Sequence, residues 1–293
     1  MAKDVFTSEE KKIFLATQPE LSKAQFNAIA DFIQTNVGIK MPEQKLVMVQ
    51  SRLLSRLKAL NMSNFDDYIS YVFAGGPQSD EEIALMINVI TTNLTNFFRE
   101  KQHFDCMTDK AIPELLELGY NTIDIWSAGC SSGEEPYTLS IVMQEYMLKN
   151  PGKVRDYSIL ATDISSNVLG KAMNAVYPME SVADLSMDLK KKYFLKSKDK
   201  ENPLVRVKPA LREKVSFQRL NFMDASYPVQ SEKHIIFCRN VLIYFDKPTQ
   251  EAVIRKLVSH LVTGGYLFLG HSETIFGMDL PLKTVGPTSF KKI

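Results

Sequence analysis

The sequence contains little that is typical of a secreted, membrane-spanning or metal-dependent protein. Only three cysteines occur in 293 residues, and their odd number and wide spacing fit reduced thiols better than a disulfide framework. The four histidines are equally scattered and show neither metal-ligand spacing nor a catalytic signature. No apolar run is long enough to cross a bilayer, and the first residues lack the apolar segment of a signal peptide. We therefore expect a cytoplasmic protein with no metal site and no membrane insertion.

Neither sign of charge dominates the chain. The 35 Lys and Arg residues nearly balance the 34 Asp and Glu residues, which leaves a net charge of +1. Such a chain is not a general polyanion binder, so we expect no nucleic-acid partner. The apolar content of 45% is sufficient for packed cores, and the length of 293 residues favours two domains.

The centre of the chain carries a strand, a tight loop and a helix in succession. Residues 122–126 form a short apolar run, Gly129 and Gly133 bracket a turn of small residues, and Pro136 is expected to open an amphipathic helix. In an open α/β sheet a nucleotide-like ligand lies at such a turn, because glycine lets the backbone approach it closely and the helix N-terminus points at it. Cys130 in this loop reads as a small filling residue, although a reactive thiol is the alternative.

Two acidic residues at the end of this loop indicate the charge of the ligand. Glu134 and Glu135 would repel a pyrophosphate at short range, which argues against a nicotinamide dehydrogenase. S-adenosylmethionine fits instead, since it carries an ammonium and a sulfonium group and no phosphate. The alternative is that both carboxylates only complement the helix dipole, and the loop alone does not decide between the two interpretations.

Further polar residues follow the predicted strands. Asp163 ends a second apolar strand over residues 156–163, where an acidic residue hydrogen-bonds ribose hydroxyls in this architecture; it could equally cap a helix that begins near Ser165. Asn221, Arg239 and Asn240 also follow strands. The carboxyl ends of strands form the edge at which open α/β sheets bind ligands, so these residues are candidates for one site.

Residues 1–90 read as a small helical domain. Helices are predicted over residues 23–33, 41–60, 64–73 and 83–91, with residues 79–82 capping the last one. The second of them carries an apolar stripe beside a basic one, whose members are Lys45, Arg52, Arg56 and Lys58. A concentrated cationic face should attract an acidic surface; the alternative is an ordinary solvated helix face.

The second predicted domain spans residues 91–293 and alternates strands with helices. Residues 177–214 interrupt this alternation with a helix, a charged turn over residues 196–203 and a strand, which predicts a small inserted subdomain with an antiparallel hairpin. The fold class expected is α/β: a Rossmann-like, mainly parallel sheet with a helical N-terminal domain and an antiparallel insert.

Four motifs carry a resemblance to a known family. They are TTNLTNFFRE at residues 91–100, WSAGCSSGEEPY at 126–137, FCRNVLIYFD at 237–246 and GHSE at 270–273. In this order they resemble the chemoreceptor glutamate methyltransferases of the CheR family, and the similarity extends over nearly the whole chain. Four ordered motifs are far more specific than a single glycine-rich turn.

The resemblance implies a methyltransferase that binds S-adenosylmethionine and releases S-adenosylhomocysteine. It implies that Arg99 and Tyr244 flank the reacting methyl group, although core packing is the alternative for Tyr244. The implied cofactor contacts are Asn93, Thr95, Arg99, Glu135, Asp163, Asn221, Phe222, Arg239 and Asn240. A glutamate side chain is already ionised near neutrality, so its methylation needs no general base.

The resemblance also implies a partner. In this family the helical domain meets the acidic methylation helices of transmembrane chemoreceptors, which gives the basic stripe a purpose. Some members are also tethered through a receptor pentapeptide by a glycine-containing hairpin, but the turn at residues 196–203 has no glycine and is highly charged, which argues against such a tether. We expect a monomer, and the functional alternative is a noncatalytic module that binds S-adenosylmethionine and signals.

Overall fold

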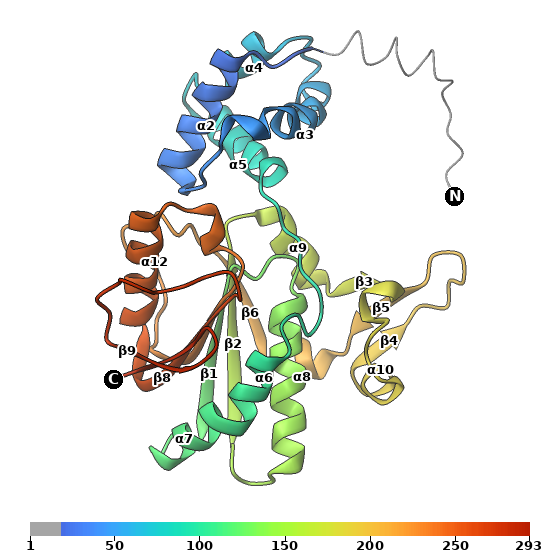
Figure 1. Ribbon diagram of the computed structural model, residues 1–293. Coiled ribbons are helices and arrows are strands. Elements are labelled where there is room, and N and C mark those ends of the chain that lie inside the picture. Colours follow the sequence, from blue (N-terminus) through green and yellow to red (C-terminus); the bar gives the residue numbers. More distant parts are fainter. Residues whose placement is uncertain (1–18) are drawn as a thin grey trace. The chain divides into compact units, whose positions relative to one another are not determined.

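The computed structural model describes residues 19–293, which divide into two compact units (Figure 1). The first unit comprises the described residues up to Asn36 together with Lys40–Thr91. The second comprises Val37–Ile39 and Thr92–Ile293. Each unit is described by itself below.

The first unit is helical, as predicted. Its elements are α2 (Lys23–Val37), the short 3-10 helix η1 (Glu43–Lys45), α3 (Leu46–Ala59), α4 (Phe65–Val72) and α5 (Pro77–Ile90). Helix α3 buries Val49, Leu53 and Leu57, whose spacing of four residues places them on one face. Asn64 caps α4 by accepting a hydrogen bond from the Asp67 N–H.

The predicted start of α5 is wrong. The helix begins at Pro77 and not near residue 83, because proline fits the first helical position, where no N–H is needed. Gly76 precedes it with a φ of 91°, which glycine adopts without strain. Ser79 therefore lies inside the helix, and its hydroxyl donates to the Val72 carbonyl instead of capping.

The second unit is built on a seven-stranded sheet with the order β6-β2-β1-β7-β8-β10-β9. The strands are β1 (Thr122–Ala128), β2 (Asp156–Asp163), β6 (Val215–Arg219), β7 (Lys233–Cys238), β8 (Leu261–Leu269), β9 (Leu282–Gly286) and β10 (Ser289–Lys292). Strands β6, β2, β1, β7 and β8 pair in parallel, whereas β10 pairs antiparallel with β8 on one side and with β9 on the other. The chain order reverses at β1, which makes the end of β1 the topological switch point.

Helices cover both faces of this sheet (Figure 1). They are α6 (Gln102–Cys106), the π-helix η2 (Met107–Ala111), α7 (Ile112–Glu117), α8 (Glu134–Lys149), α9 (Ser166–Asn174), the 3-10 helix η4 (Leu242–Tyr244) and α12 (Lys247–Ser259). The strand residues alternate between two cores: Ile125 packs with α6, α7 and α8, whereas Trp126 packs with α12. This alternation confirms the predicted Rossmann-like arrangement.

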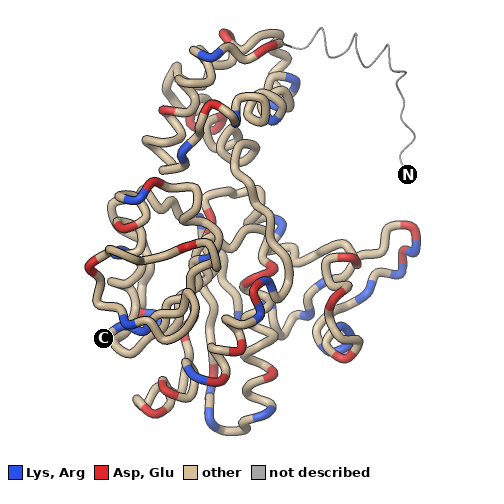
Figure 2. The backbone as a smooth tube through the Cα atoms, viewed as in Figure 1, with Lys and Arg blue, Asp and Glu red and all other residues tan. Residues whose placement is uncertain are grey.

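The inserted antiparallel subdomain is also present. It contains β3 (Val176–Pro178), η3 (Met179–Val182), α10 (Met187–Tyr193), β4 (Phe194–Lys196), β5 (Leu204–Val207) and α11 (Pro209–Arg212). Its three strands form a separate antiparallel sheet in the order β3-β5-β4. The turn between β4 and β5 carries closely spaced charges of both signs (Figure 2). Strand β3 escaped the sequence analysis because three residues are too few to show an alternation.

Candidate cofactor site

Four neighbouring strands of the large sheet end at the candidate site. Strands β6, β2, β1 and β7 are adjacent and parallel, so their carboxyl ends meet at one edge. Asn221 follows β6, Asp163 ends β2, the glycine-rich loop follows β1, and Arg239 and Asn240 follow β7. Residues far apart in the sequence are thereby brought to a single edge, next to the switch point.

The glycines of the loop after β1 are required by its packing. Gly129 has a φ of 88°, and a Cβ atom there would lie 2.4 Å from Cγ2 of Val241. Gly133 has a φ of 97°, and its Cβ would lie 2.8 Å from the Cβ of Ala172. Cys130 is buried, and burial raises the pKa of its thiol, which supports the filling role over the reactive one.

Comparing alanine at Gly129 and at Gly152 distinguishes backbone strain from steric overlap with Val241. Gly129→Ala is expected to lower the free energy of unfolding by about 1–3 kcal/mol more than Gly152→Ala, because alanine at 129 also meets Val241. Gly152 is the matched control: it has a φ of 81° with nothing within 4 Å of its Cβ position. Urea titration of both variants measures the difference, and equal losses would show that the Val241 contact is unimportant.

Four backbone N–H groups of this loop are already engaged within the protein. Those of Gly129 and Cys130 both donate to the Thr162 carbonyl, and that of Gly133 donates to the Cys130 carbonyl. The Ser131 N–H donates to Asp163 Oδ2 at 2.9 Å. A phosphate-binding loop needs such N–H groups pointing at the phosphate, so this loop is not built for a dinucleotide.

The two acidic residues of the first turn of α8 lie in different surroundings. Glu134 is buried and accepts from the Ser132 hydroxyl at 2.7 Å, and burial raises the pKa of its carboxyl group. Glu135 accepts from the Ser127 hydroxyl at 2.6 Å and pairs with Nε of Arg239 at 2.8 Å. The charge of Glu135 is therefore partly compensated within the protein, so the acidic pair repels a phosphate less than the sequence suggests.

Arg239 is the centre of the polar network at this edge. Its side chain is only 2% exposed and lies over the rings of Phe104 and Phe237. Its Nε binds Glu135, and its Nη1 donates to the Arg99 carbonyl at 2.7 Å. The guanidinium thus joins the loop after β1 to the segment that carries Arg99.

Asp163 is held by two backbone N–H donors. Oδ2 accepts from Ser131 and Oδ1 accepts from Ser165 at 3.0 Å, while burial raises the pKa of the carboxyl group. The sequence analysis considered Asp163 as a possible cap of α9. The cap is instead Ser165, whose hydroxyl accepts from the Val168 N–H. Asp163 is therefore not the N-cap of α9, and its fixed carboxylate stands at the tip of β2.

The segment after Thr91 lies against the glycine-rich loop. The Ser131 hydroxyl donates to the Asn93 carbonyl at 2.9 Å, and the Phe98 N–H donates to the Thr138 hydroxyl at 3.1 Å. Arg99 Nη1 donates to the Leu94 carbonyl at 2.9 Å, which arches the segment that contains Thr95. The predicted residues Asn93, Thr95 and Arg99 therefore share one short loop beside β1.

The other predicted residues follow β6 and β7. Asn221 Oδ1 accepts from the Met223 N–H at 3.0 Å, which fixes the turn after β6. Phe222 is buried, and its ring lies 6.2 Å from that of Phe245. The contact between these two rings connects the loop after β6 with the loop after β7. Tyr244 ends η4 and packs in part against the same core.

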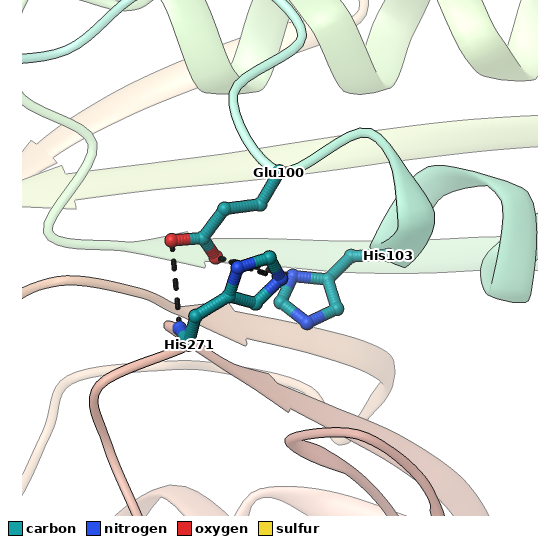
Figure 3. Close-up of side chains that lie close together, drawn as sticks. All are labelled: Glu100, His103 and His271. Atoms are coloured by element: carbon teal, nitrogen blue, oxygen red, sulfur yellow. Dashed lines mark hydrogen bonds and ion pairs between the residues drawn. The ribbon is translucent and has the colours of Figure 1, made fainter.

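A cluster of Glu100, His103 and His271 lies beside Arg239 and was not foreseen (Figure 3). One ligand atom from each residue lies within 4.8 Å of the others, as in a metal site. Arg239 Nη1, however, lies 3.3 Å from His103 Nδ1 and 3.5 Å from Glu100 Oε2. A divalent ion at these atoms would lie next to the guanidinium, a repulsion on the order of several kcal/mol even at an effective dielectric constant of about 20. The geometry therefore favours an ion pair between Glu100 and Arg239 over a metal site.

His103 makes stability depend on pH. Burial, helped by Arg239, lowers its pKa from 6.5 to about 4, so the folded protein keeps it neutral while the unfolded chain takes up a proton. The free energy of unfolding should therefore fall as pH drops from about 7 to about 4, by about 3 kcal/mol from this residue. We expect His103→Gln to lose less stability over that interval in urea titrations; identical pH profiles would contradict this.

Glu273 is the buried member of the fourth motif, and it was assigned no role. Its carboxylate is only 6% exposed and accepts four backbone N–H bonds, from Gly270, Asn240, Val241 and Leu242. Burial raises the pKa of this carboxyl group, whereas the four donors lower it. Glu273 thus ties the loop after β8 to the loop after β7.

The fold and the site together fit S-adenosylmethionine. The edge offers the fixed carboxylate of Asp163, a loop in which four N–H groups are bonded within the protein, and amide side chains at the ends of β6 and β7. This combination on a Rossmann-like sheet is compatible with an S-adenosylmethionine-dependent methyltransferase. Bound there, the cofactor supplies an electrophilic methyl group.

Comparison with known proteins identifies the family. The model described as CheR methyltransferase, SAM binding domain, matches residues 93–290, and that described as CheR methyltransferase, all-alpha domain, matches residues 24–91. The chain is 40% identical over 278 residues to a chemotaxis protein methyltransferase of Borreliella burgdorferi, which covers 93% of this chain and 95% of that protein. It is 36% identical over 270 residues to a chemotaxis protein methyltransferase of Salmonella typhimurium, with 92% and 90% covered. The chain belongs to the CheR methyltransferase family.

Proposed function

We propose that the protein transfers the methyl group of S-adenosylmethionine to glutamate side chains of chemoreceptors and forms methyl esters. Family membership supports methylation in chemotaxis, and the site adds a chemical reason for a carboxylate acceptor. A carboxylate with a pKa of about 4.3 is ionised near neutrality, so the enzyme has to orient it and exclude water rather than deprotonate it.

The observation that carries this proposal is the path through Arg239. One guanidinium binds both the cofactor-side residue Glu135 and the backbone carbonyl of Arg99. The backbone of Arg99 is thereby anchored at the edge where the methyl donor is expected, and with it the cationic side chain of Arg99. In this proposal Arg99 orients the substrate carboxylate, and the Tyr244 hydroxyl acts beside it at the reacting methyl group. Charge diminishes as sulfonium and carboxylate react, so a dry site favours the transfer.

The proposal is tested by incubating the protein with methyl-labelled S-adenosylmethionine and receptor-containing membranes. Label that appears on the receptor and is released as methanol by mild alkali is expected, because a carboxyl methyl ester hydrolyses in base. Binding of the cofactor without transfer would favour the noncatalytic signalling module. Alkali-stable label would indicate methylation of nitrogen and contradict the glutamate assignment.

The receptor-binding proposal for the basic stripe rests on residues in unequal positions. Arg56 forms a bidentate pair with Glu82, whose side chain is 3% exposed, and Arg52 Nη1 donates to the carbonyls of Ile90 and Thr91. Lys58 is exposed and Lys45 is half-buried. Substituting either arginine would disturb the helical unit itself, so the two lysines provide the cleaner test.

Reversing the charge of both lysines should weaken receptor recognition alone. Lys45→Glu with Lys58→Glu is expected to raise KM for receptor membranes about fivefold to tenfold without changing the affinity for S-adenosylhomocysteine. The matched control is Lys149→Glu with Lys153→Glu, the same change on exposed positions of the other unit. If both double variants show the same KM, the stripe is an ordinary solvated face.

Two further expectations belong to this proposal. In the part of the chain that the structure describes, no helix combines the length and apolar character needed to cross a membrane. We propose that the protein acts in the cytoplasm on the methylation helices of receptors. The glycine-free turn between β4 and β5 bends through Asp199, which accepts from the N–H groups of Glu201 and Asn202, so we propose that no receptor pentapeptide is held there.

A further inference from the structure

The loop after β7 is held in an unusual backbone conformation. Asn240 has a φ of 59°, in the left-handed region that a non-glycine residue occupies at a cost of about 1 kcal/mol or more. The surrounding structure must therefore fix it. Two carboxylates from other parts of the chain contact this loop, Glu273 at its backbone and Glu100 at the side chain of Asn240.

Glu273 binds the backbone of the loop with both oxygens. Oε1 accepts from Val241 at 2.9 Å and Leu242 at 2.7 Å, and Oε2 accepts from Asn240 at 3.0 Å and Gly270 at 2.5 Å. The N–H groups of Asn240, Val241 and Leu242 are consecutive and lie at the start of η4, where no helix or strand carbonyl of the described residues accepts them. A charged acceptor for several N–H donors in a buried place makes strong, directional bonds.

Gly270 leaves the space in which this contact forms. A Cβ atom at this position would lie 2.6 Å from Nδ2 of Asn240, 2.8 Å from the backbone nitrogen of Asn240 and 2.9 Å from Glu273 Oε2. Any larger residue would have to displace the carboxylate or the loop. Gly270 and Glu273 of the fourth motif therefore act on the same loop, although neither residue was assigned to the site from the sequence.

Glu100 fixes the other end of Asn240. Its Oε1 accepts from Asn240 Nδ2 at 3.1 Å, and its Oε2 lies 3.5 Å from Arg239 Nη1. Glu100 takes one N–H of the amide, so the second N–H and the carbonyl oxygen Oδ1 of Asn240 are the groups that a ligand could bind. The orientation of the amide is set by the protein before any ligand arrives.

We propose that Glu273 is a positioning residue for cofactor binding: it holds the loop from Asn240 to Tyr244 in the conformation that receives S-adenosylmethionine. This inference rests on the proposed cofactor contact of Asn240. The Glu273 carboxylate accepts its four hydrogen bonds from backbone N–H groups, so it acts through the loop that carries Asn240 and Tyr244. Its loss should weaken cofactor binding without altering the surface that meets the protein substrate.

The test compares Glu273→Gln with Glu114→Gln in the full chain. Glutamine keeps the shape but turns one acceptor oxygen into a donor that faces two N–H groups. We expect the Kd for S-adenosylhomocysteine to rise about tenfold in calorimetry, and amide hydrogen exchange at residues 240–242 to accelerate. Glu114 accepts from the Tyr266 hydroxyl and Lys291 at the opposite end of the sheet, so its variant should lose stability and keep wild-type Kd and exchange at 240–242.

Three results decide the inference. A Glu273→Gln protein that is less stable but binds S-adenosylhomocysteine like the wild type would overturn it, since the role would then be structural only. Should that variant not fold, Gly270→Ala replaces it, with the same expected rise in Kd; unchanged Kd there would also overturn it. Asn240→Ala distinguishes a failure of the proposed cofactor contact from a failure of the loop restraint. An unchanged Kd in Asn240→Ala would contradict the contact of Asn240 with the cofactor. Faster amide exchange at residues 240–242 in Glu273→Gln would still support the restraint of the loop by Glu273.

Discussion

Arg99→Ala is expected to lower kcat for receptor methylation by about 100-fold or more and to leave the fold intact. Among residues 19–293, the side chain hydrogen-bonds only the nearby carbonyl of Leu94, which is 81% exposed, so its removal leaves no buried group there unsatisfied. In the proposed reaction it orients the attacking carboxylate, and losing such an interaction typically costs a factor of about 100 to 1,000. Initial rates with labelled cofactor and receptor membranes measure the effect.

The matched control for Arg99 lies two residues away. The Lys101 side chain is 70% exposed and pairs with Asp105 on its own helix, so Lys101→Ala should methylate like the wild type. Circular dichroism and calorimetry with S-adenosylhomocysteine show whether both variants fold and bind. An Arg99→Ala protein with rates near those of the control would contradict the catalytic role of Arg99.

Arg239→Met is expected to be the most damaging single substitution at the site. Glu135 and Glu100 would lose the cation between them, and removing one partner of a buried ion pair typically costs about 3–5 kcal/mol of stability. The carbonyl of Arg99 would lose its donor too. We therefore expect a large fall in the free energy of unfolding and loss of measurable S-adenosylhomocysteine binding.

An exposed pair provides the comparison for Arg239. Arg255 pairs with Glu251 at 2.6 Å on α12, and its side chain is 49% exposed. Arg255→Met should therefore change stability by less than about 1 kcal/mol and leave binding unaffected. Urea titrations of the two variants measure the contrast. If both lose similar amounts of stability, the buried network does not support the site as described.

Local features of the site could be predicted from the sequence because they depend on near neighbours. The apolar run before Gly129 formed β1, and the run ending at Asp163 formed β2. The parallel order of these strands then followed from their alternation with helices. The start of α5 was misjudged because Pro77 at the first helical position outweighed the capping signal near Ser79.

The contacts that hold the site could not be predicted, because they join residues that are distant in the chain. Arg239 and Asn240 were assigned to the cofactor, but nothing in their neighbourhood shows that Glu135 and Glu100 bind them. The histidines looked scattered, yet His103 and His271 meet beside Glu100. Periodicity indicates which face of an element is buried and says nothing about which polar partners meet there.

The central claim is that the cofactor lies across the carboxyl ends of β2, β1 and β7, and a crystal structure of the complex with S-adenosylhomocysteine tests it most directly. The account predicts that the ribose hydroxyls of the ligand bind Asp163 and that its amino acid part lies near Glu135 and the segment after Thr91. The sulfur of the ligand should face Arg99. Density for the ligand elsewhere, for instance in the groove lined by Phe104, Leu116 and Tyr146, would contradict it.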